Sequence, residues 1–335
     1  MPATVKNEIV KGYLKLYPDT PSLTLSKLIY KKEPSAFSSQ ENVRHIIRYL
    51  RGQRGAALKK NVASEEFFKE PGSRAPFESM PEGIRHFNEW VPINLCESKT
   101  LIIGDVHAPY HSKEAITVAL EYGYKHGVDG ILILGDFIDF YASSRWETDP
   151  RKRDLWGEIQ AARSILESIR GGFKGVKIRV KQGNHDERYE RWLWVKAPEL
   201  LEVPDFNYEN FLHFKKHDIE LIQERRIMKI DSLNLIHGHE FGRMFSDPVN
   251  PARGVYNRGK AHCMCAHWHR TSGHSETDMD GKTIGTWSIG CVCDLHPDYA
   301  PINKWNHGFG MVENLQEDGF LVHNFKIIKG KAYNG

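Results

Sequence analysis

The sequence predicts an α/β domain preceded by a small all-helical domain, and three patterns support this. Apolar residues recur at helical spacing within the first 60 residues. From residue 98 onward, strand-sized aliphatic runs alternate with segments of helical pattern. The last third of the chain carries strand patterns in pairs, joined by turn signals. A chain of 335 residues has room for one large domain with a small one beside it.

Two short helices are predicted near the N-terminus. The first has an apolar stripe that begins at Ile9, and Pro18 ends it. The second places Leu25 and Ile29 on one face and ends before Pro34.

The third predicted helix is the most informative of the three. Ser38 or Ser39 caps it, because a serine hydroxyl accepts hydrogen bonds from the first main-chain N–H groups of a helix. It carries an apolar stripe of Val43, Ile46, Ile47 and Leu50 and a basic stripe of Arg44, Arg48 and Arg51. A three-helix unit of this kind resembles a helix-turn-helix module, whose last helix reads DNA. Basic amphipathic helices also form solvated surfaces and subunit contacts, so these interpretations stay open.

The charge distribution also separates the two predicted parts. Residues 1–70 hold 13 Lys and Arg against 7 Asp and Glu, whereas the rest of the chain holds 33 against 36. A basic part before a mildly acidic body suggests a surface that faces phosphate, although a solvated lysine-rich surface has the same composition. Prolines and glycines between the two parts predict a connector. We therefore expect a helical domain at 1–60, a connector at 61–97 and the large domain at 98–335.

The large domain begins with alternating strands and helices. We expect strands at 100–103, 131–134 and 176–180, with helices at 113–126 and 151–170 between them. These strands are almost entirely aliphatic, which is typical of a parallel sheet covered on both faces. The paired strands that follow are expected at 226–230 with 232–236, 273–277 with 283–288, and 310–314 with 319–325.

Composition argues against two other classes of protein. No stretch approaches the roughly 18–20 apolar residues that cross a bilayer, so we expect no membrane partner. The N-terminus lacks the apolar core of a signal peptide. Five cysteines, an odd number in a long chain, argue against a disulfide framework and for a reducing compartment. We therefore expect a cytoplasmic protein, whose oligomeric state the sequence leaves open.

Five short polar clusters supply the candidate chemistry. In chain order they are Asp105-Val106-His107, Gly135-Asp136-Phe137-Ile138-Asp139, Gly183-Asn184-His185-Asp186, His237-Gly238-His239 and His267-Trp268-His269. Three of them follow predicted strands, where an open α/β sheet gathers its ligand-binding loops. Aspartate, neutral histidine and an amide oxygen together suit two divalent cations that share a bridging carboxylate. That mixture is supplied by Asp105, His107, Asp136, Asn184, His237, His267 and His269, which leaves His185 and Asp139 for acid–base work.

Taken as an ordered set, these clusters resemble the motifs of the calcineurin-like metallophosphoesterase superfamily. The resemblance runs from about residue 99 to the C-terminus. The basic helical unit before it resembles modules fused to this domain in some phage-type members. The resemblance implies a sandwich of two mixed sheets flanked by helices, and a phosphoric ester hydrolase. It also implies two divalent metal ions, with Mn²⁺ expected first and Fe²⁺, Zn²⁺ or Ni²⁺ compatible with the same ligands.

The resemblance further implies a role for each residue. The first metal site would consist of Asp105, His107 and His269, and the second of Asn184, His237 and His267. Asp136 would bridge the two ions, and the hydroxide that they share would attack phosphorus in line with the leaving oxygen. His185 would protonate that oxygen, while Asp139 would orient His185 and raise its pKa.

The sequence departs from the family pattern at three positions, two of which bear on the substrate. Ala266 stands where the family has glycine before the last His-x-His, which a strand end accepts if φ is negative. Phe140 and Asp186 stand where the protein serine/threonine phosphatases of the superfamily have arginine and glutamate, which argues against a phosphoprotein substrate. Candidate contacts to substrate phosphate, each of which also suits a structural role, are Arg188, His111 and His239.

The candidate ligands also have structural interpretations. An aspartate after a strand can cap a helix, an asparagine can sit in a turn, and a histidine can be buried in a core. His237 is preferred to His239 only by the resemblance. The two C-x-C pairs, Cys263 with Cys265 and Cys291 with Cys293, are interpreted as small inward-facing strand residues, and a separate zinc site is the alternative.

The sequence therefore predicts a phosphoesterase that needs two metal ions and acts on a phosphodiester of nucleic acid or a nucleotide. The diester substrate and the DNA partner rest on the basic third helix and on the missing phosphatase-type arginine. One alternative is a phosphomonoesterase that acts on a small phosphate compound. Another is a DNA-binding regulator with a vestigial phosphoesterase body, which the complete ligand set argues against.

Overall fold

The computed structural model describes residues 3–52, 81, 83, 91–223, 225–242 and 249–334. The chain divides into two compact units, one within Met1–His86 and one within Phe87–Gly335. Most of the predicted connector at 61–97 lies outside the described residues, so the predicted domain boundaries stay predictions. In these described ranges, no helix is long and apolar enough to cross a membrane.

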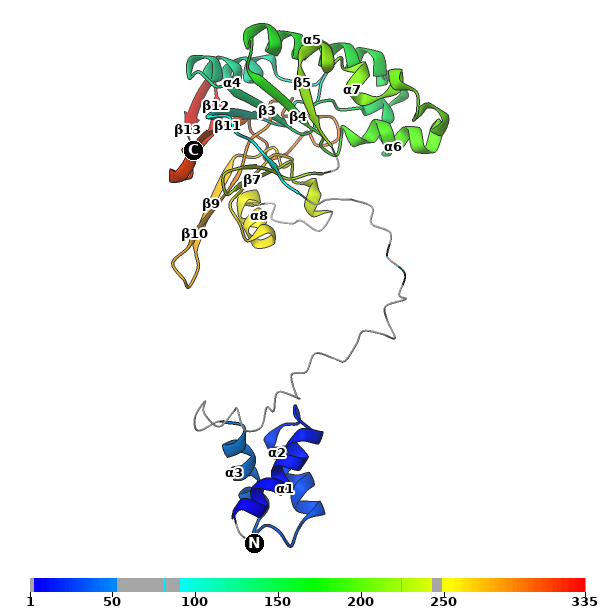
Figure 1. Cartoon of the computed structure of the whole chain (residues 1–335). Coiled ribbons are helices and arrows are strands. Elements are labelled where there is room, and N and C mark those ends of the chain that lie inside the picture. Colours follow the sequence, from blue (N-terminus) through cyan, green and yellow to red (C-terminus); the bar gives the residue numbers. More distant parts are fainter. Residues whose placement is uncertain are drawn as a thin grey trace. The chain divides into compact units, whose positions relative to one another are not determined.

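Three helices pack around a small apolar core in the first unit (Figure 1). They are α1 (Ala3–Leu16), α2 (Ser22–Lys32) and α3 (Gln40–Leu50), as the apolar spacing predicts. The hydroxyl of Ser39 accepts the N–H of Asn42 at 3.1 Å and caps α3. Val43, Ile47 and Leu50 are buried, so the arginine stripe lies off the core-facing side of α3.

The three arginines of this stripe have different environments. Arg44 is half-buried and Arg48 is exposed. The guanidinium of Arg51 donates to the Ser22 hydroxyl at 3.0 Å and to two main-chain carbonyls of the turn between α1 and α2 at 2.6 and 2.8 Å. Arg51 therefore ties the end of α3 to that turn, and its hydrogen bonds are made inside the helical unit.

A seven-stranded mixed sheet lies at the centre of the second unit. Strands β2 to β5 run parallel, whereas β11 pairs antiparallel with β2 and with β12, and β12 with β13. The predicted parallel strands are confirmed, and three antiparallel strands extend their sheet. In sheet order the strands are β13 (Lys331–Asn334), β12 (Phe320–Ile328), β11 (Gly308–Asn314), β2 (Lys99–Ile103), β3 (Gly130–Leu134), β4 (Lys177–Lys181) and β5 (Ile219–Ile222).

A six-stranded mixed sheet packs face to face against the first, with an apolar core between them. The predicted antiparallel pairs are confirmed, since β6 pairs with β7, β9 with β10, and β11 with β12. Two mixed sheets flanked by helices are the α/β sandwich that the resemblance implies. In sheet order the strands are β1 (Ile93–Asn94), β6 (Met228–Ile230), β7 (Leu233–Ile236), β8 (Cys263–Cys265), β10 (Thr283–Ser288) and β9 (Ser272–Thr277).

Helices cover the outer faces of the two sheets. The seven-stranded sheet is covered by α4 (Lys113–Lys125) and α5 (Leu155–Gly172), which share a core with it (Figure 1). The six-stranded sheet carries α8 (Pro251–Gly259), whose Val255 packs on β7 and β8. Two further helices, α6 (Glu187–Lys196) and α7 (Tyr208–Phe211), follow β4.

Burial on both faces explains the aliphatic runs of β2 and β3. Leu101 and Ile103 of β2 face the core under the helices, whereas Ile102 faces the core between the sheets. In β3, Ile131 and Leu132 alternate between the two cores in the same way. Both runs therefore present apolar side chains in both directions, whereas β4 alternates charged and apolar residues.

The predicted helix at 151–170 is divided into two pieces. Pro150–Lys152 form a short 3-10 turn, and the carboxylate of Asp154 accepts the N–H of Gly157 at 2.9 Å to start α5 at Leu155. The helical pattern continued across this boundary, but the cap at Asp154 decides where the helix begins.

Candidate metal centre

Loops at the carboxyl ends of three neighbouring parallel strands form one half of the site. Asp105 follows β2, Asp136 follows β3 and Asn184 follows β4. Hydrogen bonds join these loops. Asp136 accepts two main-chain N–H groups, that of His107 at its carbonyl oxygen, 2.9 Å away, and that of His185 at its carboxylate, 2.7 Å away. The parallel order of the strands brings these side chains to one edge of the sheet.

The other half comes from the six-stranded sheet. His237 follows β7, and His267 and His269 follow β8. The main-chain N–H of His267 donates to the carboxylate of Asp105 at 2.9 Å, which joins the two halves. All seven ligands predicted from the sequence therefore lie where the ends of the two sheets meet.

Five of these residues have left-handed backbone conformations. Their φ angles lie between 49° and 72°, a region that residues other than glycine rarely adopt. Such conformations persist only where the surrounding structure holds them, and they are concentrated at functional sites. The five residues are Asp105, His107, Asp136, His267 and His269.

Two glycines of the motifs allow the loops to approach this closely. A Cβ atom on Gly135, whose φ is 91°, would collide with the ring of His237. A Cβ atom on Gly183 would collide with the carboxylate of Asp136. Ala266 is accepted without strain because its φ is not positive, and its methyl group fills the space beside Gly104.

The carboxylate of Asp136 lies at the middle of the cluster. Its Oδ2 is 3.2 Å from Nε2 of His237 and 3.8 Å from Nε2 of His107. Potential ligand atoms within 4.8 Å of one another form one group from Asp105, His107 and Asp136 and another from Asp136, His237 and His267. Asp136 belongs to both groups. His269 extends the first group, with its Nε2 3.3 Å from Nε2 of His107. Asn184 extends the second, with its Oδ1 3.2 Å from Nε2 of His237.

The charges in this cluster fit divalent cations. Asp105 and Asp136 are buried carboxylates, which need positive charge nearby. Burial alone would lower the pKa of His237, but Asp136 beside it raises that pKa to about 10. Burial, reinforced by His237, lowers the pKa of His267 to about 3. A proton on His237 Nε2 thus lies among an Asp oxygen, an Asn oxygen and a His nitrogen, which are ligands that a divalent metal prefers.

His185 lies beside the cluster in a chain of hydrogen bonds. Its Nδ1 is 2.9 Å from the carboxylate of Asp139, and its Nε2 accepts from the guanidinium of Arg188 at 2.7 Å. Asp139 is also 2.9 Å from Nδ1 of His107, so one carboxylate orients two rings. Asp139 raises the pKa of His185, as expected, and so does Asp136. Burial lowers that pKa by more, so the net shift is downward.

Three residues were predicted to contact substrate phosphate, and they differ in how they are connected to the metal centre. Arg188 reaches the site through His185 and the main chain of Asp139. His239 is buried and turned away, with its Nε2 3.1 Å from the carboxylate of Glu187. His111 pairs through its main chain with Cys293 on the neighbouring loop. Arg188 is therefore the one of the three with a side chain bonded to the candidate catalytic residues in the described structure.

Sequence reasoning missed the groups that hold the loops in place. The carboxylate of Asp186 accepts the N–H groups of Phe137, Ile138 and Gly183 and the hydroxyl of Tyr208. A buried ion pair between Lys181 and Glu240 supports His237, whose N–H donates to Glu240 at 3.0 Å. No sequence signal marked Lys181, because charged and apolar residues alternate throughout β4 and only the fold buries this lysine.

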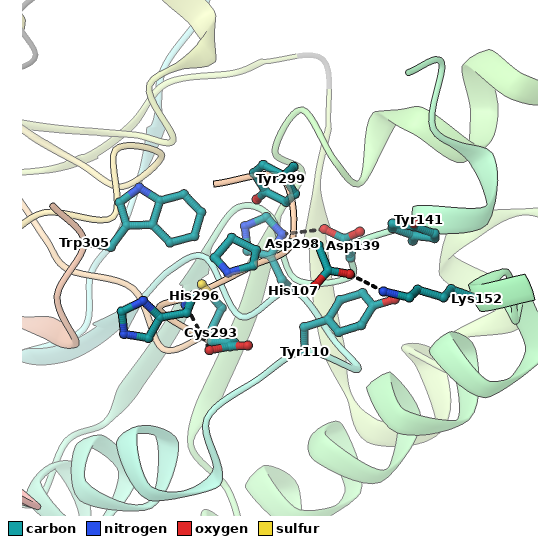
Figure 2. Close-up of a pocket in the computed structure, with 12 residues that line it drawn as sticks. His107, Tyr110, Asp139, Tyr141, Lys152, Cys293, His296, Asp298, Tyr299 and Trp305 are labelled. Atoms are coloured by element: carbon teal, nitrogen blue, oxygen red, sulfur yellow. Dashed lines mark hydrogen bonds and ion pairs between the residues drawn. The ribbon is translucent and has the colours of Figure 1, made fainter. Parts of the chain in front are cut away.

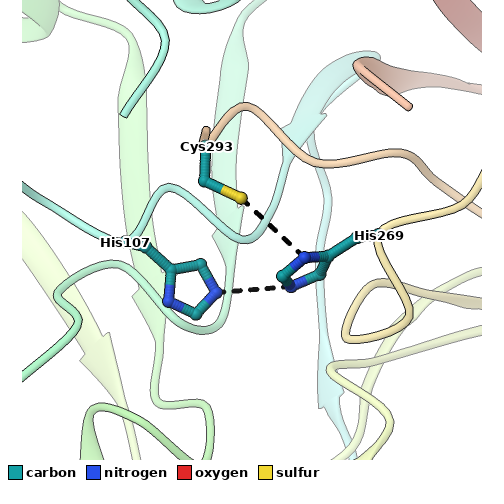
Figure 3. Close-up of side chains that lie close together, drawn as sticks. All are labelled: His107, His269 and Cys293. Carbon is teal, nitrogen blue, oxygen red and sulfur yellow. Dashed lines mark hydrogen bonds between the residues drawn. The ribbon is translucent and has the colours of Figure 1, made fainter. Parts of the chain in front are cut away.

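Cys293 was also missed as part of the site. Its Sγ is 3.8 Å from Nδ1 of His269, on the ring edge opposite the nitrogen that faces His107 (Figure 3). The two C-x-C pairs do not form a joint cluster among the described residues, where the one candidate metal group with a cysteine is His107, His269 and Cys293. The interpretation of Cys263 and Cys265 as inward-facing strand residues is confirmed, since both are buried in β8.

An aromatic pocket opens directly beside the cluster. Figure 2 shows Tyr110, Tyr141, Tyr299 and Trp305 around it, together with His107 and Asp139 of the site. An ion pair between Lys152 and Asp298 closes one side. A small ligand in this pocket would contact the residues around His107 and the aromatic rings at the same time.

Comparisons of the sequence with known proteins identify a family and two phage relatives. The family model for calcineurin-like phosphoesterases matches residues 98–286. The Gene 54 proteins of Mycobacterium phages L5 and D29 are 26% and 24% identical over 227 residues, which are 64% of this chain and 88% of each relative.

Among solved structures, a Vps29 from Entamoeba histolytica is 13% identical, with a TM-score of 0.38, and covers 71% of this chain and 97% of its own. Yfce, a phosphoesterase from E. coli, is 17% identical, with a TM-score of 0.32, over 64% of this chain and 88% of its own.

The family assignment rests on a match that spans more than half of the chain and includes all seven residues of the cluster. Members of this family use divalent metal ions, and the donor set of the cluster suits such ions. The chain belongs to the calcineurin-like phosphoesterases and is a metal-dependent phosphoric ester hydrolase with a phosphoester substrate.

Proposed function

We propose that the protein is a two-metal phosphodiesterase that acts on nucleic acid. The position of Asp136 carries this proposal, because its carboxylate belongs to both groups of potential ligand atoms. A bridging carboxylate is what two divalent cations about 3.5–4 Å apart require. In the proposal one ion is held by Asp105, His107 and His269, the other by Asn184, His237 and His267, and Asp136 is shared.

The metal ions would polarise the phosphate and supply the nucleophile at neutral pH. We propose Mn²⁺ as the first ion to test. The donor set also suits Fe²⁺, Zn²⁺ and Ni²⁺, which are tested next. The remaining work falls to side chains of the chain itself. Asp105 and Asp136 balance the positive charge, and the strained loops around them keep the ligands converged before any ion arrives.

His185 is the proposed general acid. In the substrate-free chain the guanidinium of Arg188 donates to its Nε2, so the imidazole is neutral and its proton lies on Nδ1, toward Asp139. We propose that substrate phosphate draws Arg188 away from His185. His185 can then carry a second proton on Nε2 and deliver it to the leaving oxygen, while Asp139 stabilises the charged ring.

A diester fits the surroundings better than a phosphoprotein monoester. Phe140 is buried and stacked on Tyr189, with ring centroids 5.4 Å apart, so no cation occupies the position where the family's phosphoprotein phosphatases have arginine. A diester carries one negative charge and needs fewer cations than a doubly charged monoester. The basic α3 of the first unit supports DNA as the source of the diester.

The test compares metal-reconstituted turnover of bis(4-nitrophenyl) phosphate and 4-nitrophenyl phosphate by the full chain. We expect the diester to be preferred, and Asp136→Asn to lose bound metal and nearly all turnover because the shared charge is removed. His185→Ala should keep its metal content but cleave an oligonucleotide, whose alkoxide leaving group needs a proton, roughly 10²–10⁴-fold more slowly. Metal content measured on each variant separates the two roles.

Three results would contradict the proposal. Preference for the monoester would replace the diester with a small phosphate compound as substrate. Full turnover of the oligonucleotide by His185→Ala would remove the general acid assigned to that residue. Turnover with no metal added, and no metal bound, would exclude the two-metal site itself.

A further inference from the structure

A groove leads away from the metal centre between the loop after Phe140 and helix α6. It consists of two adjoining cavities that share Ser144, Trp146 and Arg188 in their walls. One cavity, of about 520 Å³, reaches Asp139 and His185, and the other, of about 390 Å³, reaches Asn184. Each volume is in the range of pockets that take a nucleotide-sized ligand.

The wall of this groove carries an open aromatic surface. The indole of Trp146 is 66% exposed, and the guanidinium of Arg145 lies over it at 4.9 Å from the ring centroid. Trp192 of α6 lines the same cavity, and Tyr299 lines the cavity nearer the metal centre. Flat apolar rings in a cavity wall suit a flat partner with a π-face, such as a nucleobase.

The cavity around Trp192 carries positive charge, whereas the cavity nearer the metal centre also holds the carboxylates of Asp139, Glu147 and Asp298. Among the described residues that line the cavity around Trp192, the charged ones are Arg145, Arg188, Arg191 and Lys196, and none is a carboxylate. Arg191 is paired with Glu187 on α6, so its charge is partly neutralised. The others line a path that starts at Arg188, beside the candidate general acid, and continues outward past Trp146. Cations along a groove attract a polyanionic backbone.

We propose that this groove binds a single-stranded polynucleotide, with a base stacked on Trp146 and neighbouring phosphates held by Arg145 and Lys196. The proposal rests on the proposed phosphodiesterase function, in which one phosphate of the strand binds at the metal centre around Asp136. A stacking surface needs unpaired bases, because the bases of a duplex are stacked on one another and face inward. DNA and RNA strands offer the same phosphates and base faces, so the shared chemistry is that of a single strand.

Binding is measured first, by fluorescence anisotropy of a labelled single strand of about 20 nucleotides with the full chain in EDTA, where cleavage is suppressed. Trp146→Ala should weaken binding about tenfold, the typical effect of losing one base–aromatic stack. Arg145→Gln should weaken binding and lower its salt dependence. The first unit is present in every variant, so its own contribution to binding cancels in the comparison.

Trp156→Ala is the matched control. Trp156 is 60% exposed and has the guanidinium of Arg163 at 5.2 Å from its ring centroid, but it lies on α5 and lines none of the cavities of the groove. We expect this variant to bind the strand as the wild type does. DNA and RNA strands of one sequence identify the sugar. A duplex of that sequence should bind Trp146→Ala and wild type alike, because its bases are already stacked on one another.

Turnover provides the second measurement. With metal present, Trp146→Ala should lower kcat/KM for the oligonucleotide about tenfold more than it lowers kcat/KM for bis(4-nitrophenyl) phosphate. Equal binding of the strand by Trp146→Ala, Trp156→Ala and wild type would overturn the proposed strand-binding groove, as would an equal loss of strand and duplex binding in Trp146→Ala. If the wild type had no diesterase activity, the proposed function would be overturned instead. The binding comparison would still show whether the groove binds a single strand.

Discussion

Each of three histidines in the metal centre has its far ring nitrogen held by a different partner. His107 is held by the carboxylate of Asp139, His237 by the carbonyl of Leu134 at 2.8 Å, and His269 by the sulfur of Cys293. A hydrogen bond at Nδ1 fixes the ring orientation and leaves Nε2 directed into the site. Single residues therefore decide which nitrogens converge on Asp136.

The contact between Cys293 and His269 is the longest of the three, at 3.8 Å, and it can be tested by mutation. Cys293→Ala should lower metal affinity roughly 10–100-fold, because His269 loses the group that orients its ring. The measurement is a titration of Mn²⁺ against a competing fluorescent chelator. Cys291→Ala is the control, since this buried thiol faces the carbonyl of Asn306 at 3.7 Å instead of a histidine. Equal affinities for the two variants would show that Cys293 has no part in orienting the ring.

At the scale of elements, the site depends on loops that are tied to the helices behind them. Asp186, at the start of α6, accepts main-chain N–H groups from the loops after both β3 and β4. Glu158 in the first turn of α5 does the same for the 3-10 turn Tyr141–Ser143, accepting the N–H groups of Tyr141 and Ala142 at 3.0 and 3.1 Å. The position of Asp139 therefore depends on contacts made by two helices.

Glu158 also gives the fold a pH dependence. Burial, with Asp139 nearby, raises the pKa of Glu158 to about 7, above its ordinary value of 4.5. The protonated form is favoured in the folded state, so its contribution is complete below about pH 4.5 and is lost as the pH rises to about 7. We expect the free energy of unfolding of the wild type to fall by up to about 3 kcal/mol relative to Glu158→Gln across this window.

Urea unfolding of both proteins at a series of pH values measures this difference. Taking the difference removes the contributions of the other titrating groups, which the two proteins share. Stability curves that stay parallel from pH 4.5 to 8 would contradict the prediction, because Glu158 would then titrate alike in the folded and unfolded chains.

At the scale of the whole molecule, a basic helical unit is joined to a mildly acidic catalytic unit. Residues 1–70 hold nearly twice as many basic as acidic residues, whereas the rest of the chain has a small excess of acidic ones. We propose that the first unit holds DNA and the second cleaves it. Arg51 is left out of the proposed DNA surface because its hydrogen bonds are made to the turn between α1 and α2.

The DNA surface is tested by changing Arg44 and Arg48 together to alanine in the full chain. The double variant should bind DNA more weakly and lower the slope of log affinity against log salt by about 2, one unit for each lost phosphate contact. The control changes Lys31 and Lys32, exposed cations at the end of α2, to alanine. If both double variants bind alike, α3 is a solvated surface and not a DNA-reading helix.

Local patterns in the sequence determined most of the fold and the composition of the site. Helical spacing located α1 to α3, and aliphatic runs located β2, β3 and β4. The polar clusters after β2, β3, β4, β7 and β8 contain the candidate ligands that lie around Asp136. The helix and strand predictions succeeded because capping and periodicity depend on residues that are close in the sequence.

Tertiary structure alone decided which atoms meet. His107 and His269 are 162 residues apart, and their ring nitrogens lie 3.3 Å from each other only because the two sheets bring the loops after β2 and β8 together. The same convergence gives Asp139 two histidine partners, places Cys293 behind His269 and buries Lys181 against Glu240. Contacts of this kind depend on strand order and sheet packing, which no stretch of neighbouring residues encodes.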